Sequence, residues 1–221
     1  LEIADPYYAD AVSLYSKAKV IAEIINNPVS FNPKIVEGIS TQFDEYLPII
    51  SPDQEMAFFT RRSDKKSLQS ITVTTVEEFI MSQKIDKQFK VGSPMTYPFN
   101  LESNEGGASI TIDNKILYYT KCIRNEKGYN NCDIFYVFNH NGVWSAAQPF
   151  SDNISQSTTW ESQPTVSSDG KTIIFASDRN GGYGKMDLYE INLIDEKWTA
   201  PKNLGSNINS NEYEKSPYLH T

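Results

Sequence analysis

The chain has 221 residues, of which 39% are hydrophobic and 12% aromatic, and it carries a net charge of −8. This composition is typical of a globular protein and excludes a disordered one, while the acidic balance argues against a nucleic-acid partner. No apolar run approaches 18 residues, so we expect no membrane-spanning segment.

The first predicted element is one α-helix, which forms a separate N-terminal region over residues 1–28. Asp5 is a good N-cap with Pro6 at the first helical position, and Pro28 ends the helix. Apolar residues at spacings of three and four predict one apolar stripe: Tyr8, Ala11, Val12, Tyr15, Ala18, Ala22 and Ile25. The helix either packs against the region that follows or ends an upstream domain of tetratricopeptide-type helices.

Residues 29–221 contain three copies of one sequence repeat and the start of a fourth copy. Each copy opens on a glutamate: Glu45, Glu105, Glu161 and Glu214. A turn acid follows eight residues later, at Asp53, Asp113 and Asp169, and a second acid follows further on, at Glu78, Asp133 and Asp187. Such self-similarity indicates a repeat architecture. We therefore expect the repeated glutamates to have structural roles, such as accepting backbone N–H bonds or pairing with a neighbour.

Each copy predicts four short antiparallel strands. In the third copy Asp169 and Gly170 separate two apolar, β-branched runs, which is a strong hairpin signal. A third strand follows the second acid, and a fourth follows a large aromatic residue: Phe89, Trp144 or Trp198. Four such strands form one blade of a β-propeller. The predicted fold is all-β, a partial β-propeller with three recognisable four-stranded blades plus fragments and one N-terminal α-helix.

The ends of this region predict an open ring. Residues 31–40 are similar to residues 198–208, so they are expected to form an outer strand without inner strands of its own. The matching inner strands would follow Thr221, so the propeller region 29–221 is incomplete at its C-terminus. We therefore expect the chain to be a piece of a larger protein.

The two cysteines bear on the cellular compartment. Cys122 ends the second strand of its blade and Cys132 begins the third, so the two can meet across a hairpin. A disulfide between them would imply an oxidising compartment. The alternative is two free thiols that are close together.

The sequence gives little support for catalysis. It has no G-x-S-x-G or H-E-x-x-H motif, and its two histidines, His140 and His220, lie in a tight turn and beside the terminus. The loop from Asp178 to Asp187 does not have the spacing of a calcium site. We predict no catalytic residue, no metal and no cofactor.

Partner specificity is expected where the copies differ. Basic residues that end or follow the second strands fall on one face of the ring: Arg61, Arg62, Lys121, Arg124 and Arg179. Arginine binds carboxylates in bidentate fashion, so this rim is a candidate partner surface. The alternative is local pairing with acids such as Asp64, Glu126 and Asp178. Trp160 is a candidate for stacking on a glycan, and the extra chain at 63–76 is a further contact candidate.

Two motifs carry a family resemblance, SPDQEMAFFTRR at 51–62 and SSDGKTIIFASDRNGGYGKMDLYEI at 167–191. They resemble TolB-like β-propeller repeats, over residues 29–221, of the kind found in outer-membrane-associated proteins of Bacteroidota-type bacteria. There the propeller often follows tetratricopeptide helices and precedes a peptidoglycan-binding domain of the outer-membrane-protein-A type. The pair Cys122 and Cys132 is also similar to one such blade.

The resemblance implies a non-enzymatic scaffold that binds other envelope proteins. It implies a periplasmic, outer-membrane-associated location, often as a lipoprotein, and some relatives belong to type IX secretion. Peptidoglycan would be bound only through a domain that these residues do not contain. Two alternatives stay open: the propeller domain of a prolyl-peptidase-like hydrolase whose catalytic domain lies elsewhere, and a glycan-binding propeller.

Overall fold

The computed structural model describes residue 5 and residues 7–66, 73–101, 104–124, 130–151 and 153–220. Within these ranges the side chains of Lys65, Lys66, Val73, Thr74, Arg124 and Asn130 are not described. The chain divides into two units, Leu1–Ile35 and Val36–Thr221. The sequence places this boundary slightly earlier, after residue 28.

The first unit contains helix α1, Tyr8–Asn26. It begins later than predicted, with Tyr7 as the N-cap residue, although the Asp5 carboxylate still accepts the Tyr7 N–H at 2.8 Å; Pro6 lies outside the described residues. Most apolar side chains of α1 are exposed and none is buried, and both interpretations of this helix stay predictions. No helix in the described part of the chain combines the length and apolar character needed to cross a membrane.

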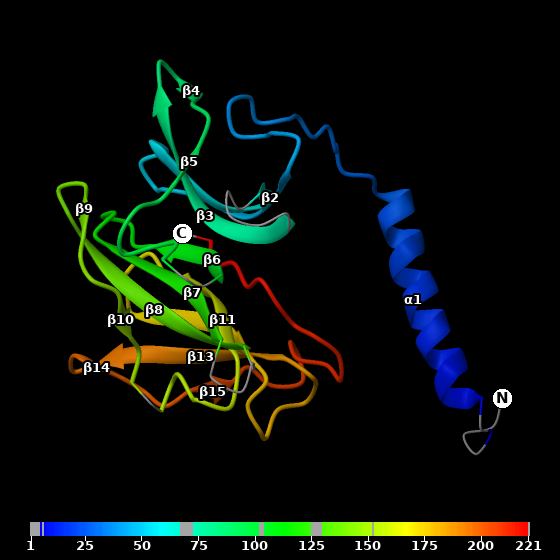
Figure 1. The fold of residues 1–221 in the computed structure, drawn as a ribbon. Coiled ribbons are helices and arrows are strands. Elements are labelled where there is room, and N and C mark those ends of the chain that lie inside the picture. The colour runs from blue at the N-terminus through cyan, green and yellow to red at the C-terminus, as the bar shows by residue number, and fades with distance from the viewer. Residues whose placement is uncertain are drawn as a thin grey trace. The chain divides into compact units, whose positions relative to one another are not determined.

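The second unit contains three antiparallel sheets, which we call blades 1, 2 and 3 (Figure 1). Blade 1 comprises β1 Asp44–Ile50, β2 Met56–Lys66, β3 Val73–Ile85, β4 Gln88–Phe89 and β5 Ser93–Pro94. Blade 2 comprises β6 Asn104–Ile110, β7 Ile116–Arg124, β8 Asn130–His140, β9 Val143–Trp144 and β10 Gln148–Pro149. Blade 3 comprises β11 Glu161–Val166, β12 Thr172–Ser177, β13 Asp187–Ile194, β14 Lys197–Trp198 and β15 Lys202–Asn203. The first three strands of each blade pair in chain order, which confirms the predicted partial propeller-like all-β fold.

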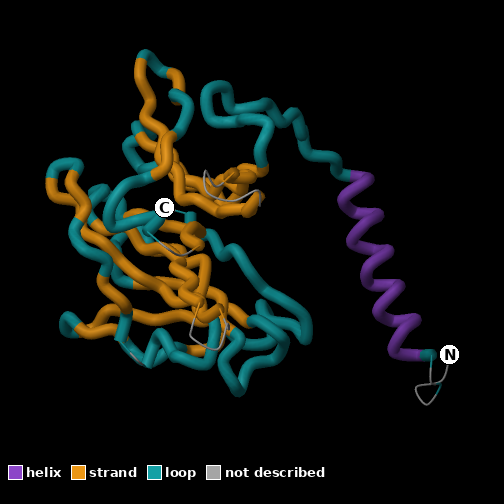
Figure 2. Tube along the Cα trace, in the orientation of Figure 1, coloured by secondary structure: helices purple, strands orange, loops and turns teal. Residues whose placement is uncertain are grey.

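The fourth strand of each blade differs from the prediction. Instead of one strand, two strands of two residues each pair with the third strand, separated by a loop (Figure 2). In blade 2, Trp144 lies opposite Asn139 and Gln148 lies opposite Tyr136. Pro149 ends the second of these segments, and proline lacks the N–H that would continue a ladder. The outer edge of each blade is therefore short and broken.

The first strands carry a bulge at the same position in each copy. Two residues after the repeated glutamate, Leu47, Gly107 and Gln163 have φ values of 50°, 54° and 55°, and the pairing register shifts there. A residue in the left-handed region inserted into one strand is a β-bulge. Ser216 repeats the feature in the fourth copy, with φ 53°. Corresponding residues thus adopt the same unusual backbone, which confirms the repeat register.

The blades bury their faces against one another. Because side chains alternate between the two faces of a strand, Tyr119 packs with Phe58 and Phe79 between blades 1 and 2, whereas Tyr118 packs with Phe175 between blades 2 and 3. The Phe79 and Tyr119 rings are stacked with their centroids 6.1 Å apart. Blade 2 therefore contributes one face to each of the two cores, and its adjacent aromatic residues Tyr118 and Tyr119 point into different cores.

The predicted outer strand at 31–40 does not form. A turn at residues 37–39 closes there instead, with the N–H groups of Ile39 and Ser40 both donating to the Val36 carbonyl. The ladder partners of β1–β15 all lie within their own blades, and a strand needs a paired neighbour. Residues 31–40 still resemble residues 198–208, because both segments contain the same kind of turn. In the second segment the N–H groups of Ile208 and Asn209 both donate to the Gly205 carbonyl.

The fourth copy begins as predicted. Tyr213 bridges Met186 in parallel, the Ser216 N–H donates to Gln163 Oε1 at 2.7 Å, and the Leu219 N–H donates to Thr165 at 3.1 Å. The segment from residue 213 to 219 thus lies beside blade 3 as the start of a further first strand.

Candidate functional site

The repeated glutamates hold the loops that lead into each blade. Glu161 Oε2 accepts the Gln156 N–H at 3.0 Å, and Glu45 Oε2 accepts the Thr41 N–H at 3.2 Å. Glu105 does the same for the loop before blade 2. The predicted structural role of these acids is confirmed.

The same glutamates pair with three of the predicted rim cations. The ion pairs are Arg61 to Glu45 at 2.8 Å, Lys121 to Glu105 at 3.5 Å and Arg179 to Glu161 at 3.0 Å. Only 9–16% of each cationic side chain is exposed. Among the described residues, the alternative of local pairing therefore holds for these three, with the repeated glutamates as the acids. Contact of these cations with a partner stays a prediction.

Hairpin register explains these pairs. Glu45 lies directly opposite Arg61, and Glu105 opposite Lys121. In blade 3, Glu161 lies opposite Ser177, and Arg179 reaches back from two residues further on. The equal separation of the first two acid–base pairs along the sequence is a signal from which their pairing could have been predicted.

The remaining rim candidates have different surroundings. Arg62 donates to Asp44 at 2.6 Å with about half of its side chain exposed. The side chain of Arg124 lies outside the described residues. Trp160 is half-buried, and its backbone N–H donates to Asp178 at 2.7 Å. Arg62 is therefore the most accessible of the rim cations whose side chains are described.

The disulfide between Cys122 and Cys132 is formed, with an S–S distance of 2.00 Å. The two residues lie opposite each other at the ends of β7 and β8, as the sequence predicts. This pairing supersedes the alternative of two free thiols and fits an oxidising compartment.

Loss of the disulfide is expected to destabilise the protein. The loop spans ten residues, so the double variant Cys122→Ser/Cys132→Ser should lose about 2–3 kcal/mol in the free energy of unfolding, measured by urea denaturation. Wild-type protein in reductant should unfold at the same urea concentration as the variant. A non-reduced peptide map should show one cross-linked pair, and two alkylatable thiols in exported protein would contradict the assignment.

A small cavity of about 150 Å³, which we call the mouth pocket, lies where the first strands begin; its walls include Tyr46, Gly107, Cys132, Trp160 and Lys215. Burial and a hydrogen bond with Glu77 raise the pKa of Tyr46. That bond also fixes one wall of the pocket.

Two glycines of blade 2, Gly106 and Gly107, line the mouth pocket, and neighbouring residues approach both of them closely. Blades 1 and 3 carry larger residues at the positions of Gly106 and Gly107. A Cβ on Gly106 would lie 1.9 Å from Thr60 Oγ1, and one on Gly107 would lie 3.2 Å from Gln163 Cγ. This part of the pocket wall is thus formed where blade 2 departs from the repeat.

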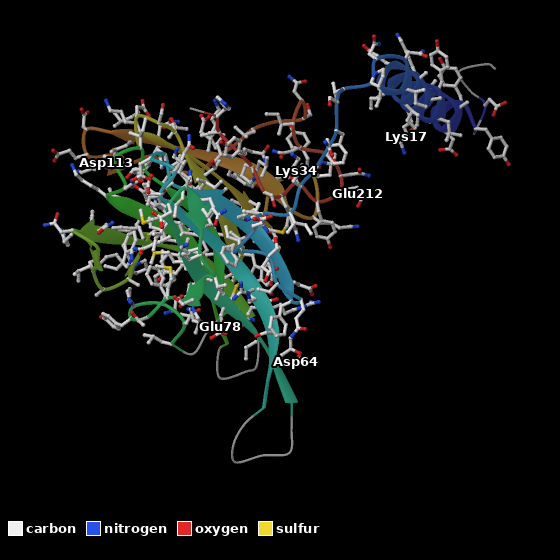
Figure 3. All side chains as sticks on the ribbon, turned by 90° about the horizontal axis from the view of Figure 1, so that it is seen from above. Lys17, Lys34, Asp64, Glu78, Asp113 and Glu212 are labelled. Atoms are coloured by element: carbon white, nitrogen blue, oxygen red, sulfur yellow. A yellow bond between two sulfur atoms is a disulfide. The ribbon has the colours of Figure 1, made fainter. Side chains whose placement is uncertain are left out.

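The extra chain in blade 1 forms a projecting ribbon, which carries Asp64 (Figure 3). Asp44 pairs with Arg62, and beyond this point residues 63–66 pair only with β3 among the described strands. A groove of about 350 Å³ beside the ribbon is lined by residues that include Phe43, Arg62 and Asp64. Residues 67–72 of the predicted contact segment 63–76 lie outside the described residues. This groove, which we call the ribbon groove, and the mouth pocket lie at the same end of the strands.

The opposite end of the strands carries a larger groove of about 690 Å³ with apolar walls, among them Ile49, Ile110 and Val166. The turn acids lie at this end. Each accepts a hydroxyl hydrogen bond from the residue two positions earlier, which lowers the pKa of Asp53, Asp113 and Asp169. This arrangement recurs in every blade, so we assign it to the architecture.

The carboxylate of Asp187 holds the loop from Asp178 to Asp187 in place. Asp187 Oδ1 accepts the Gly184 N–H at 2.9 Å, and Asp187 Oδ2 accepts an N–H from the Asn203 side chain at 2.7 Å. The acid therefore ties the loop to the outer edge of blade 3.

No family model matches the chain, and no curated protein matches it. Among solved structures it is similar to a puromycin-hydrolyzing peptidase of Mycobacterium tuberculosis, with 11% identity, a TM-score of 0.49 and coverage of 76% of this chain and 24% of that one. It is also similar to a protein of unknown function from Dyadobacter fermentans, with 10% identity, a TM-score of 0.47 and coverage of 80% and 55%. The chain thus spans less than two thirds of either protein.

Proposed function

We propose that this chain is a non-enzymatic protein-interaction module of the bacterial cell envelope, in the periplasm and associated with the outer membrane. Within that setting it would act as an accessory part of a secretion or assembly machine such as type IX secretion. The resemblance to TolB-like propeller repeats supports this setting, and the disulfide is consistent with it.

One observation carries the proposal. The repeated charged residues are engaged within the fold, whereas the departures from the repeat gather at one end of the strands. These departures are the glycines of the mouth pocket, Trp160 on its wall, and the ribbon with its groove. Residues that serve the architecture recur in every blade, so a cluster of differences at one end marks the surface on which specificity depends.

Arg62 is the residue for which we expect the largest effect on binding. Its guanidinium lies on the wall of the ribbon groove and is half exposed, so it can contact a carboxylate of a partner while Asp44 orients it. We assign Trp160 the role of a half-buried aromatic anchor at the edge of the mouth pocket. Arg61, Lys121 and Arg179 contribute indirectly, by holding the strand ends in place.

The proposal predicts that Arg62→Glu lowers capture of an envelope partner by roughly tenfold, because a charge-assisted contact becomes a repulsive one. Quantitative pull-down from cross-linked envelope extracts measures the effect. Lys115→Glu is the matched control, because Lys115 is also exposed and paired with an acid, Asp113, but lies in a turn at the other end of the strands. Equal capture by both variants would contradict the proposal.

A further inference from the structure

Two carboxylates meet where blade 2 contacts blade 3. Asp133 lies on β8 and Glu161 begins β11, and their side chains are within hydrogen-bonding reach of each other. Asn131 Nδ2 donates to Asp133 Oδ2 at 2.9 Å. The other oxygen, Asp133 Oδ1, is buried and has no hydrogen-bond partner among the described residues.

The surroundings of Glu161 show which acid is ionised. Its side chain has no exposed surface and accepts hydrogen bonds from Gln156, Ser177 and Arg179, all of which are donors. The Glu161 side chain therefore acts as an acceptor toward each of these groups. A second buried carboxylate beside it is unfavourable unless one of the two carries a proton, and that proton also satisfies the unpartnered oxygen of Asp133.

We propose that Asp133 and Glu161 share one proton across the boundary between blades 2 and 3, and that loss of this proton as the pH rises loosens the boundary. The proton resides on Asp133, which donates to Glu161. This shared proton therefore makes the contact between blades 2 and 3 depend on pH. It does not depend on the proposed partner-binding function.

Two other charged groups, Lys121 and Arg179, affect the ionisation of Asp133 and Glu161. Lys121 lies opposite Asp133 in the β7–β8 ladder and favours the ionised form, but its ammonium group pairs with Glu105. Arg179, which follows β12, pairs with Glu161 and stabilises that carboxylate. Burial, and then the charge of Glu161, raises the pKa of Asp133 to about 6.

The sign of the effect follows from this shift. The folded chain binds the proton more tightly than the unfolded chain, in which the aspartate has its ordinary pKa of 3.8. The contribution of Asp133 to the free energy of unfolding is therefore fully present below pH 3.8. It is lost as the pH rises to about 6 and beyond.

Loosening at this boundary would reach the mouth pocket. Cys132 and Trp160 are the chain neighbours of Asp133 and Glu161, and both line the pocket. Separation of the two acids would therefore move two walls of the pocket apart.

The variant Asp133→Asn tests the proposal, because asparagine keeps the shape and can donate to Glu161 at every pH. We expect the folding equilibrium constant of the wild type to fall by about tenfold more than that of the variant between pH 4.5 and pH 7.5, after allowance for solvent screening. Urea denaturation at the two pH values measures this. Parallel pH profiles of wild type and variant would overturn the proposal.

Asp113→Asn is the matched control. A hydroxyl hydrogen bond from Thr111 lowers the pKa of Asp113, so its replacement should cost stability at pH 7.5 and not at low pH, which is the opposite sign.

Hydrogen exchange separates a loosened boundary from a change in overall stability. The N–H of Gln156 donates to Glu161, and the N–H of Gln163 donates to Thr120 of blade 2. After correction for intrinsic rates, both amides should exchange faster at pH 7.5 than at pH 5 in the wild type, and equally at the two values in Asp133→Asn. Equal protection at both pH values in the wild type would overturn the proposal.

Discussion

Replacement of Glu161 with alanine is expected to lower the free energy of unfolding by about 3–5 kcal/mol. Its buried carboxylate binds the Gln156 N–H, two hydroxyl groups and the guanidinium of Arg179. Only 9% of the Arg179 side chain is exposed, so the variant would leave a nearly buried cation without its acid. Urea denaturation at pH 5, where Asp133 keeps its proton, should show the full loss.

The matched control is Glu45→Ala, which removes the corresponding acid of blade 1. Both members of the Arg61–Glu45 pair retain some exposure, 12% and 15%, so water can partly replace the lost carboxylate. We therefore expect a clearly smaller loss than in Glu161→Ala. A loss for Glu161→Ala no larger than that for Glu45→Ala would contradict the structural role assigned to the repeated acid.

Replacement of Phe79 with alanine is expected to cost about 3–5 kcal/mol as well, because it opens a cavity between blades 1 and 2. The ring is fully buried and lies 6.0 Å from Phe58, 5.5 Å from Phe99 and 6.1 Å from Tyr119, measured between centroids. Urea denaturation measures the loss, and near-UV circular dichroism should report disturbed packing of the neighbouring aromatic rings.

Phe138→Ala supplies the comparison for Phe79→Ala. Phe138 lies on β8 but remains 39% exposed and packs against Tyr136 at the surface. Its removal leaves a smaller void and should cost well under half as much. Similar losses for the two variants would show that stacking of blades 1 and 2 contributes little to stability.

Several features of the fold could be predicted because their signals are local. The hairpin at Asp169 and Gly170 depends only on residues adjacent in the chain. The pairing of Cys122 with Cys132 depends on one hairpin register, which places both residues at facing strand ends. The repeated glutamates could be recognised as structural because a residue present in every copy must serve every copy.

Other features were missed because they depend on how strand ends are paired and supported. The predicted strand at 31–40 is absent, because a ladder forms only where a neighbour is available. The fourth strands are broken by loops, and in blade 2 Pro149 ends the second segment. The basic rim was predicted from where the cations fall along the chain. Whether a cation reaches a partner depends on the acid opposite it, and Glu45 lies opposite Arg61.

By itself, the sequence determined the spacing of the repeat, the first hairpin of each copy and the disulfide, since each of these depends on spacing along the chain. The tertiary structure alone decided the shape of the mouth pocket and the contact between Asp133 and Glu161. These features join residues of different blades, and their distances are set only when the aromatic cores bring the sheets face to face. Blade stacking therefore decides which residues of separate copies can act together.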